Sequence, residues 1–118
     1  MRLARSRTVL AACTAALLPA LAPAQAPDAS RIERGAALFA HTCGVCHREG
    51  GTGTFILTRR LGSERALLER RTDLPPDYVR FVVRNGLVNM PRISRVELPD
   101  ADLDAVIAWL SRDAAAVR

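Results

Sequence analysis

Two cysteines and a histidine stand close together in the run Cys43-Gly44-Val45-Cys46-His47. Residues i and i+3 lie on the same face of a helix, so one helical turn directs both thiols the same way. The imidazole of the next residue is a common metal ligand. This is the attachment pattern of a c-type haem, whose porphyrin edge bonds the two sulfurs and whose iron takes the imidazole. The run therefore predicts a covalent haem held by Cys43, Cys46 and His47.

Other uses of two neighbouring thiols compete with haem attachment. An oxidising compartment favours a disulfide between Cys43 and Cys46. A thioredoxin-like redox pair requires a βαβ context, and no alternating strand pattern of useful length is present. A structural zinc site needs four ligands, and without Cys13 of the N-terminal segment the chain has only two cysteines and two histidines, which is a poor set for zinc. The redox pair and the zinc site are therefore disfavoured, and the disulfide is the alternative to haem attachment.

The N-terminal segment has the features of a secretory signal peptide. Three arginines within residues 1–7 precede an almost wholly apolar stretch, 8–21, which is too short for a transmembrane helix. Residues 22–24, Ala-Pro-Ala, fit the small-x-small rule, so we expect cleavage after Ala24, a periplasmic location and no remaining membrane anchor. Cys13 ends a run that resembles a lipoprotein cleavage box. The apolar stretch before Cys13 is short for that use, so a cleaved signal peptide is the favoured interpretation.

The mature chain has the size and charge of one small, nearly neutral domain. Removing residues 1–24 from 118 leaves 94, which we divide into a short linker, 25–29, and a domain, 30–118. Losing three arginines lowers the formal net charge from +5 to +2. The high isoelectric point therefore gives no support for nucleic acid binding. A covalently held apolar macrocycle would enlarge the thin core of such a domain.

Helical patterns and long loops predict an all-α fold. The capping box Ser30-Arg31-Ile32-Glu33 opens a helix that we expect to end near the haem motif. Turn and cap residues predict further helices over 64–71, 75–86 and 99–110, with loops at 50–54 and 87–97. Loops this long in a small domain make sense if they wrap a flat prosthetic group. The sequence thus predicts three to five short helices around one haem.

Apolar spacing predicts the inward faces of these helices. Leu67 and Leu68 are expected to face inward in the second helix. In the third helix the same spacing is shown by Tyr78, Phe81 and Val82. The apolar stripe of the last helix consists of Leu103, Val106, Ile107 and Leu110.

From about Ser30 to Leu110 the chain resembles the class I cytochromes c, small monohaem electron carriers. The motif at 43–47 carries the resemblance together with the run 84–91, Arg-Asn-Gly-Leu-Val-Asn-Met-Pro. In that family the first and last helices cross at a small residue and an aromatic. The positions that fit this crossing are Gly35, Phe39, Val106 and Trp109. The resemblance implies the cytochrome c fold with one haem c.

The resemblance also implies that Met90 is the distal ligand of the haem iron, opposite His47. A thioether is a soft ligand, and Met/His ligation raises the reduction potential. The competing role of a lone methionine is to fill a gap in the core. His41 lies two residues before Cys43, too close to reach the far face of the haem, and is expected to be exposed.

Three further positions concern the surroundings of the haem. Gly53-Thr54 stands where the family usually has Gly-Pro, and the Thr54 carbonyl is expected to accept a hydrogen bond from His47. Without proline the φ angle there is not restricted. Arg59 and Arg60 are candidates to pair with the haem propionates, the alternative being a solvated charge pair.

With both axial positions filled, the resemblance implies a single-electron carrier rather than an enzyme. The chain is similar to the cytochrome subunits of flavocytochrome dehydrogenases of the 4-cresol dehydrogenase type. That similarity implies a flavin-containing dehydrogenase subunit as electron donor, with the respiratory chain as acceptor. A free carrier that serves a terminal oxidase is the competing arrangement. A haem sensor or peroxidase-like enzyme would require an open distal site, and so depends on Met90 not binding the iron.

Overall fold

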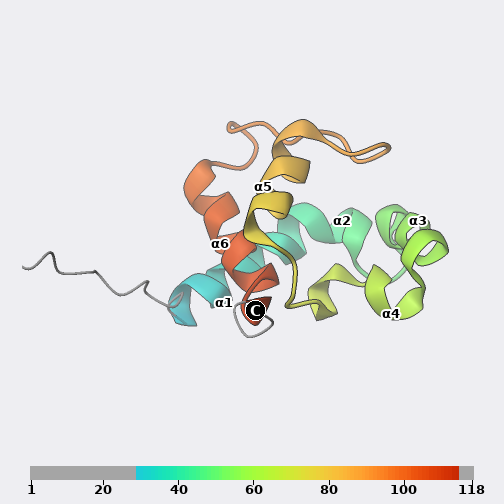
Figure 1. Ribbon diagram of the computed structural model, residues 1–118. Coiled ribbons are helices and arrows are strands. Elements are labelled where there is room, and N and C mark those ends of the chain that lie inside the picture. Colours follow the sequence, from blue (N-terminus) through green and yellow to red (C-terminus); the bar gives the residue numbers. More distant parts are fainter. Residues whose placement is uncertain (1–28, 115–118) are drawn as a thin grey trace, which may run out of the picture.

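The computed structural model describes residues 29–114, and every regular element in that range is helical (Figure 1). The α-helices are α1 (Ala29–Leu38), α2 (Gly44–His47), α3 (Thr52–Leu61), α4 (Ser63–Ala66), α5 (Pro76–Asn85) and α6 (Asp100–Leu110). A π-helical turn, Phe39–Cys43, joins α1 to α2, and a 3-10 turn, Leu68–Arg70, follows α4. The all-α prediction is confirmed. The expected signal peptide and nearly all of the linker lie outside the described residues.

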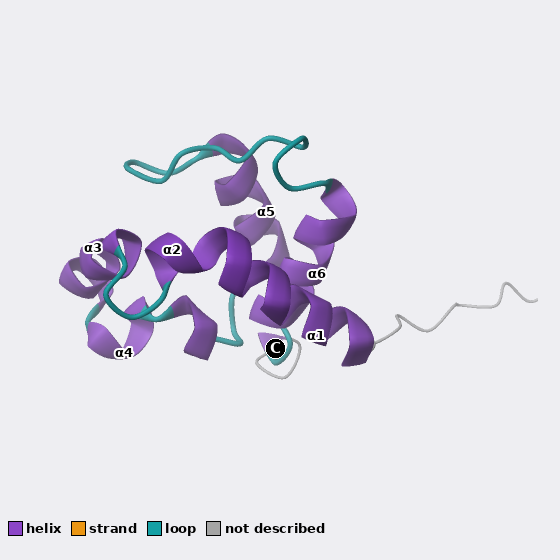
Figure 2. Ribbon diagram, turned by 180° about the vertical axis from the view of Figure 1, so that it is seen from behind, coloured by secondary structure: helices purple, strands orange, loops and turns teal. Residues whose placement is uncertain are grey.

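The centre of the fold is the crossing of α1 and α6 (Figure 2). Gly35 is buried in α1, and a Cβ atom built on it would lie 2.0 Å from the carbonyl oxygen of Ala105 in α6. The Phe39 ring packs against Trp109, with ring centroids 4.8 Å apart. Val106 is also buried here. The predicted crossing of the first and last helices is therefore present, and glycine is what allows the close approach.

The first helical stretch continues through the haem motif, because α1, the π turn and α2 follow one another without a break from Ala29 to His47. The sequence predicts only that the helix ends near the motif. A π turn holds one extra residue and is often found at functional sites. Here it lies between Phe39, which is buried in the core, and Cys43, which belongs to the motif.

Two predictions about the middle of the chain are wrong. The sequence predicts a loop over residues 50–54, but α3 begins at Thr52. Glycine and β-branched threonine are weak helix formers, and contacts of α3 with α2 and α4 outweigh that preference. The helix expected over 64–71 is interrupted at Leu67, whose backbone is extended. Leu67 and Leu68 are half-buried, whereas Ala66 is the fully buried side chain of this segment.

Helix α5 has the predicted ends but a different buried face. Pro75 caps it, and Gly86 follows with φ of +78°, in the range that favours glycine. Its buried side chains are Val79, Val82 and Val83, of which the sequence predicts Val82 to face inward. The side chains of Tyr78 and Phe81, expected to face inward, are 50% and 58% exposed.

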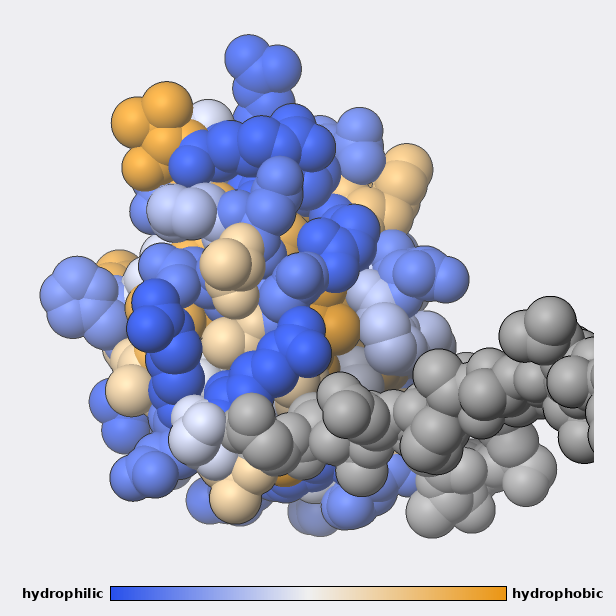
Figure 3. All heavy atoms as spheres, turned by 90° about the vertical axis from the view of Figure 1, so that its left-hand side faces the viewer, coloured by the Kyte–Doolittle hydropathy of each residue, from blue (hydrophilic) through white to orange (hydrophobic). Residues whose placement is uncertain are grey.

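The sides of α1 and α6 seen in Figure 3 are mostly hydrophilic. Ion pairs link α1 to α6 through Arg34 and Asp102, and α5 to α6 through Arg80 and Asp104. No helix among residues 29–114 is long and apolar enough to cross a bilayer. Apolar side chains instead gather inside, between the α1–α6 pair, α5 and the loop that follows α5.

Candidate haem site

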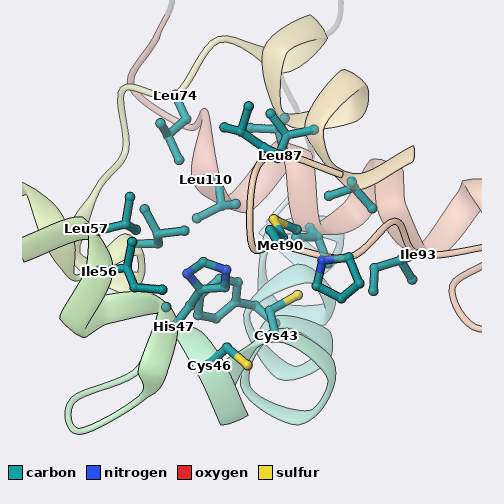
Figure 4. A pocket seen from close by; sticks show the side chains of 18 of the residues that line it. Cys43, Cys46, His47, Ile56, Leu57, Leu74, Leu87, Met90, Ile93 and Leu110 are labelled. Carbon is teal, nitrogen blue, oxygen red and sulfur yellow. The ribbon is translucent and has the colours of Figure 1, made fainter. Parts of the chain in front are cut away.

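A cavity of about 300 Å³ opens between the helical stretch that ends at His47, helices α3 and α5, and the loop after α5 (Figure 4). Its walls are mainly apolar, with side chains such as Ile56, Leu57, Leu74 and Leu110. The predicted site residues Cys43, Cys46, His47, Arg60 and Met90 all lie in its lining. Segments far apart in the sequence thus meet at one interior space, of the size and polarity typical of a cofactor pocket.

The two thiols lie at one side of this cavity, one turn apart in the chain. Both are free, Cys43 half-buried and Cys46 exposed, so the structure holds no disulfide between them. Burial, and secondarily the neighbouring Cys46, raises the pKa of the Cys43 thiol to about 11. Cys43 is therefore protonated at neutral pH.

His47 is the last residue of α2, and its imidazole points into the cavity (Figure 4). A Cβ atom on Gly53 would lie 2.8 Å from the backbone carbonyl oxygen of Cys46 and 3.1 Å from Cε1 of His47, so glycine at 53 allows α3 to approach the motif closely. Burial lowers the pKa of His47. The ring is therefore held neutral, which is the form that binds a metal.

The hydrogen bond expected between His47 and the Thr54 carbonyl is not formed. Thr54 lies within α3, and its carbonyl accepts the hydroxyl of Thr58 at 2.9 Å. The buried Nδ1 of His47 has no hydrogen-bond partner among the described residues. The physical reason is that α3 begins at Thr52, so the Thr54 carbonyl lies within the helix and takes part in its hydrogen bonding.

Met90 reaches the cavity from a tight turn after α5 (Figure 4). The backbones of Leu87 and Met90 exchange two hydrogen bonds, of 3.0 and 2.9 Å, which close the turn. Val88 inside it has φ of +54°, the only positive φ of a non-glycine residue in the described range. A β-branched residue is strained in that region. The turn thus presents the half-buried Met90 in a defined backbone geometry.

Arg84 holds this loop, a role that the sequence reasoning above missed. Its guanidinium donates to the carbonyls of Ile93 (3.0 Å) and Leu98 (2.8 Å). It also pairs with the carboxylate of Asp100 at 2.7 Å. The Arg84 side chain is only 12% exposed. Arg80 and Asp77 lie on the same side of α5, so the sequence pattern gives no signal for this role, which the burial of Arg84 shows.

The remaining candidate residues divide between the cavity and the surface. His41 is exposed, as expected. Arg60 lines the cavity. Arg59 is not in the lining, and its guanidinium lies over the Phe55 ring, 5.9 Å from the centroid. Arg71, which no sequence motif singled out, also lines the cavity.

These residues fit a c-type haem. The cavity has apolar walls for the macrocycle, two free thiols, a neutral imidazole and a thioether sulfur. Within residues 29–114 no group of three or more His, Cys, Asp or Glu side chains could hold a bare metal ion. The donor set therefore suits an iron that the porphyrin already holds, with imidazole and thioether as added ligands.

A comparison with protein families gives the same result. Residues 30–110, well over half of the chain, match the model of cytochrome c oxidase, cbb3-type, subunit III. No curated protein and no solved structure matches the chain. The matched range extends from the start of α1 to the end of α6, so it includes the whole cavity. The helical architecture described above is that of a cytochrome c domain, and the chain belongs to the family of cytochrome c oxidase, cbb3-type, subunit III.

Proposed function

We propose that this protein is a single-electron carrier with one haem c, attached through Cys43 and Cys46. His47 and Met90 are the proposed axial ligands. The observation that carries the proposal is that these four side chains line one apolar cavity although Met90 comes from a separate loop. Membership of a c-type cytochrome family supports the same function.

When bound, the haem supplies an iron that gains or loses one electron. The chain supplies the ligands and the medium around them. Burial keeps the His47 imidazole neutral, and the Met90 sulfur is a soft ligand that raises the potential. The apolar walls exclude water, which strengthens electrostatic effects on the iron. If His47 and Met90 hold the iron as proposed, the haem would supply electron transfer rather than a site for a substrate.

The proposed route of electrons is from a dehydrogenase to the respiratory chain, in the periplasm after export. A flavin-containing subunit is the proposed donor. A terminal oxidase is the proposed end of the route, which the oxidase named in the family description supports. Val45, 81% exposed, and the exposed Cys46 mark the edge through which a partner would dock. Redox encounters of this kind need only a small interface.

The covalent link separates this function from a loosely bound haem. The protein, produced with haem-attachment machinery, is expected to show a low-spin c-type spectrum when reduced. Its haem should stay with the polypeptide during acid-acetone extraction. Cys43→Ala with Cys46→Ala should release it, whereas His41→Gln should not. Haem extracted freely from the unaltered chain would disprove the thioether attachment.

The donor is tested separately from the cofactor. A gene for a flavoprotein beside the gene for this chain supports a dehydrogenase subunit. A flavin dehydrogenase encoded there, once supplied with its substrate, should reduce the ferric protein as soon as the two proteins are mixed. No reduction would favour the free carrier.

A further inference from the structure

The loop that carries Met90 returns to the helix from which it starts. It leaves α5 after Asn85, turns, and comes back beside the end of that helix before α6 begins (Figure 1). The backbone N–H of Ile93 donates to the carbonyl of Val83 at 2.7 Å, which closes the loop on α5. The backbones also pack closely here, since a Cβ atom on Gly86 would lie 2.7 Å from the carbonyl oxygen of Met90. Met90 is thus carried by a closed loop whose two ends meet at α5.

Arg84 ties the returning half of this loop to both helices. Besides the carbonyls of Ile93 and Leu98 and the carboxylate of Asp100, its guanidinium donates to the carbonyl of Ser94, at 3.3 Å. One side chain therefore connects α5, the loop and the first turn of α6. Its Nε is buried and has no hydrogen-bond partner among the described residues. The two terminal nitrogens alone therefore fix the side chain in place.

The other contacts of the loop do not do the same work. Ile93 and Leu98 pack against the apolar core, but hydrophobic contacts have no preferred direction. Arg95 pairs with Asp100, but its side chain is 72% exposed, and exposed ion pairs contribute little to stability. The bonds from the part-buried Arg84 are the directional contacts that set where the loop, and with it Met90, stands relative to α5.

We propose that Arg84 is a positioning residue for Met90, and that its hydrogen bonds to the loop set the affinity with which an external ligand replaces the Met90 sulfur on the haem iron. The inference rests on the proposed function, because it takes Met90 as an axial ligand. An external ligand reaches that side of the iron only when the loop moves away. Such a movement breaks the bonds from Arg84 to the carbonyls of Ile93 and Leu98. The apparent affinity for the external ligand is therefore reduced in proportion to the fraction of molecules whose loop is open.

The experiment is a titration of the oxidised holoprotein with imidazole at about pH 8, above the ordinary pKa of an imidazole. Loss of the weak far-red sulfur–iron band reports replacement of Met90. Neutral imidazole is the probe because the charge of Arg84 has little direct effect on it. Arg84→Gln should bind imidazole about tenfold more tightly than the unaltered protein, because two hydrogen bonds of ordinary strength no longer resist opening of the loop. The band should still be present before imidazole is added.

Arg80→Gln is the matched control. It removes the same charge one turn earlier in α5, and its ion pair with Asp104 does not involve the loop. Its affinity for imidazole should equal that of the unaltered protein. Arg84→Lys keeps a cation but loses the planar fork that reaches several acceptors, so its affinity should lie between those of the unaltered protein and Arg84→Gln. The lysine variant also serves as the test if Arg84→Gln does not fold. Equal affinities in Arg80→Gln and Arg84→Gln, or an unaltered affinity in Arg84→Lys, would overturn the positioning role.

Failure of this inference and failure of the proposed function give different results. A sulfur–iron band that responds to imidazole in the same way in every variant would leave Met90 as a ligand and remove only the role of Arg84. An oxidised holoprotein without that band would remove Met90 as a ligand, and the role of Arg84 with it, while leaving the haem attachment intact. A protein that never acquires covalent haem would overturn both proposals.

Discussion

Gly35 in α1 and Ala105 in α6 lie so close that a Cβ atom on Gly35 would sit 2.0 Å from the Ala105 carbonyl oxygen. The obstacle is backbone, which cannot turn away as a flexible side chain can. Gly35→Ala is therefore expected to push the two helices apart, at a cost of about 2 kcal/mol or more despite the better helix propensity of alanine. Thermal or denaturant unfolding of the holoprotein measures this directly.

A matched control is Gly44→Ala, because Gly44 is also a buried glycine in a helix. A Cβ there would meet Cδ of Arg48 at 2.7 Å, the movable part of a half-exposed side chain. Gly44→Ala should be neutral or stabilising by up to about 1 kcal/mol. Equal losses of stability in Gly35→Ala and Gly44→Ala would show that the close approach of α1 and α6 does not require glycine at position 35.

Met90→Leu tests the proposed distal ligand while keeping the volume of the side chain. Isosteric exchanges of this kind cost less than about 1.5 kcal/mol through packing. The weak far-red sulfur–iron band of the oxidised protein should disappear and the reduction potential should fall, because the soft thioether is lost. An unchanged band would show that Met90 is not a ligand, and would reopen the sensor or peroxidase-like interpretation.

Val88→Gly tests the strain in the turn that carries Met90. A β-branched residue at φ of +54° is strained by about 1–3 kcal/mol, whereas glycine adopts this region freely. Val88 is 81% exposed, so little buried surface is lost. The variant should be more stable by about 1 kcal/mol after the entropy cost of glycine.

Val96 provides the comparison for that variant, since it is 94% exposed and has no positive φ. Val96→Gly should be neutral or destabilising by up to about 1 kcal/mol, the ordinary cost of glycine. The same effect in both variants would show that Val88 stores no strain.

Arg84→Gln tests the anchoring of the Met90 loop. The variant removes the donor that bonds the carbonyls of Ile93 and Leu98. Leaving an acceptor without a partner costs about 1–3 kcal/mol where it is buried, and less for part-buried carbonyls such as these. Amide hydrogen exchange should accelerate through residues 87–98 before it does so in α1 or α6. Arg80→Gln, which removes a more exposed ion pair with Asp104, should leave exchange in the loop unchanged.

Asp100→Asn tests the contribution of an ion pair to acid stability. Hydrogen bonds from Arg95, and next from Arg84, lower the pKa of the Asp100 carboxyl below its ordinary value of 3.8. A lowered folded-state pKa stabilises the protein above the unfolded-state value, and the gain is lost as the pH falls through the folded-state value. The variant should therefore be less stable than the unaltered protein at pH 7, with the difference shrinking below about pH 4.

Asp77→Asn is the control for helix-dipole effects, because Asp77 also lies in the first turn of a helix. Within residues 29–114 it makes no ion pair. The loss of stability in Asp77→Asn should be smaller than in Asp100→Asn, and it should not depend on Arg84 or Arg95. If both variants lost stability equally across the pH range, the ion pair would not be the cause.

Short local patterns predicted more of this protein than periodicity over longer stretches did. The cap residues around α5 and α6 are correct because Pro75, Gly86 and Pro99 act through their own backbone angles. The start of helix α3 is not predictable locally because Gly53 and Thr54 disfavour a helix, and only contacts with α2 and α4 outweigh that preference. Periodicity gives the wrong inward face for α5 because Tyr78 lines the cavity and Phe81 is exposed, while Val79, Val82 and Val83 are buried.

The sequence by itself determined the chemistry of the attachment motif and the kind of fold, because the spacing of Cys43, Cys46 and His47 and the helix caps act over a few residues. Only the tertiary structure decided which distant side chains meet at that motif. It brings Met90 to the cavity through a loop anchored by Arg84. It also places Arg60 and Arg71 in the cavity lining and directs Arg59 away from it. These outcomes depend on the direction of each side chain and on long-range packing, neither of which is encoded in local spacing.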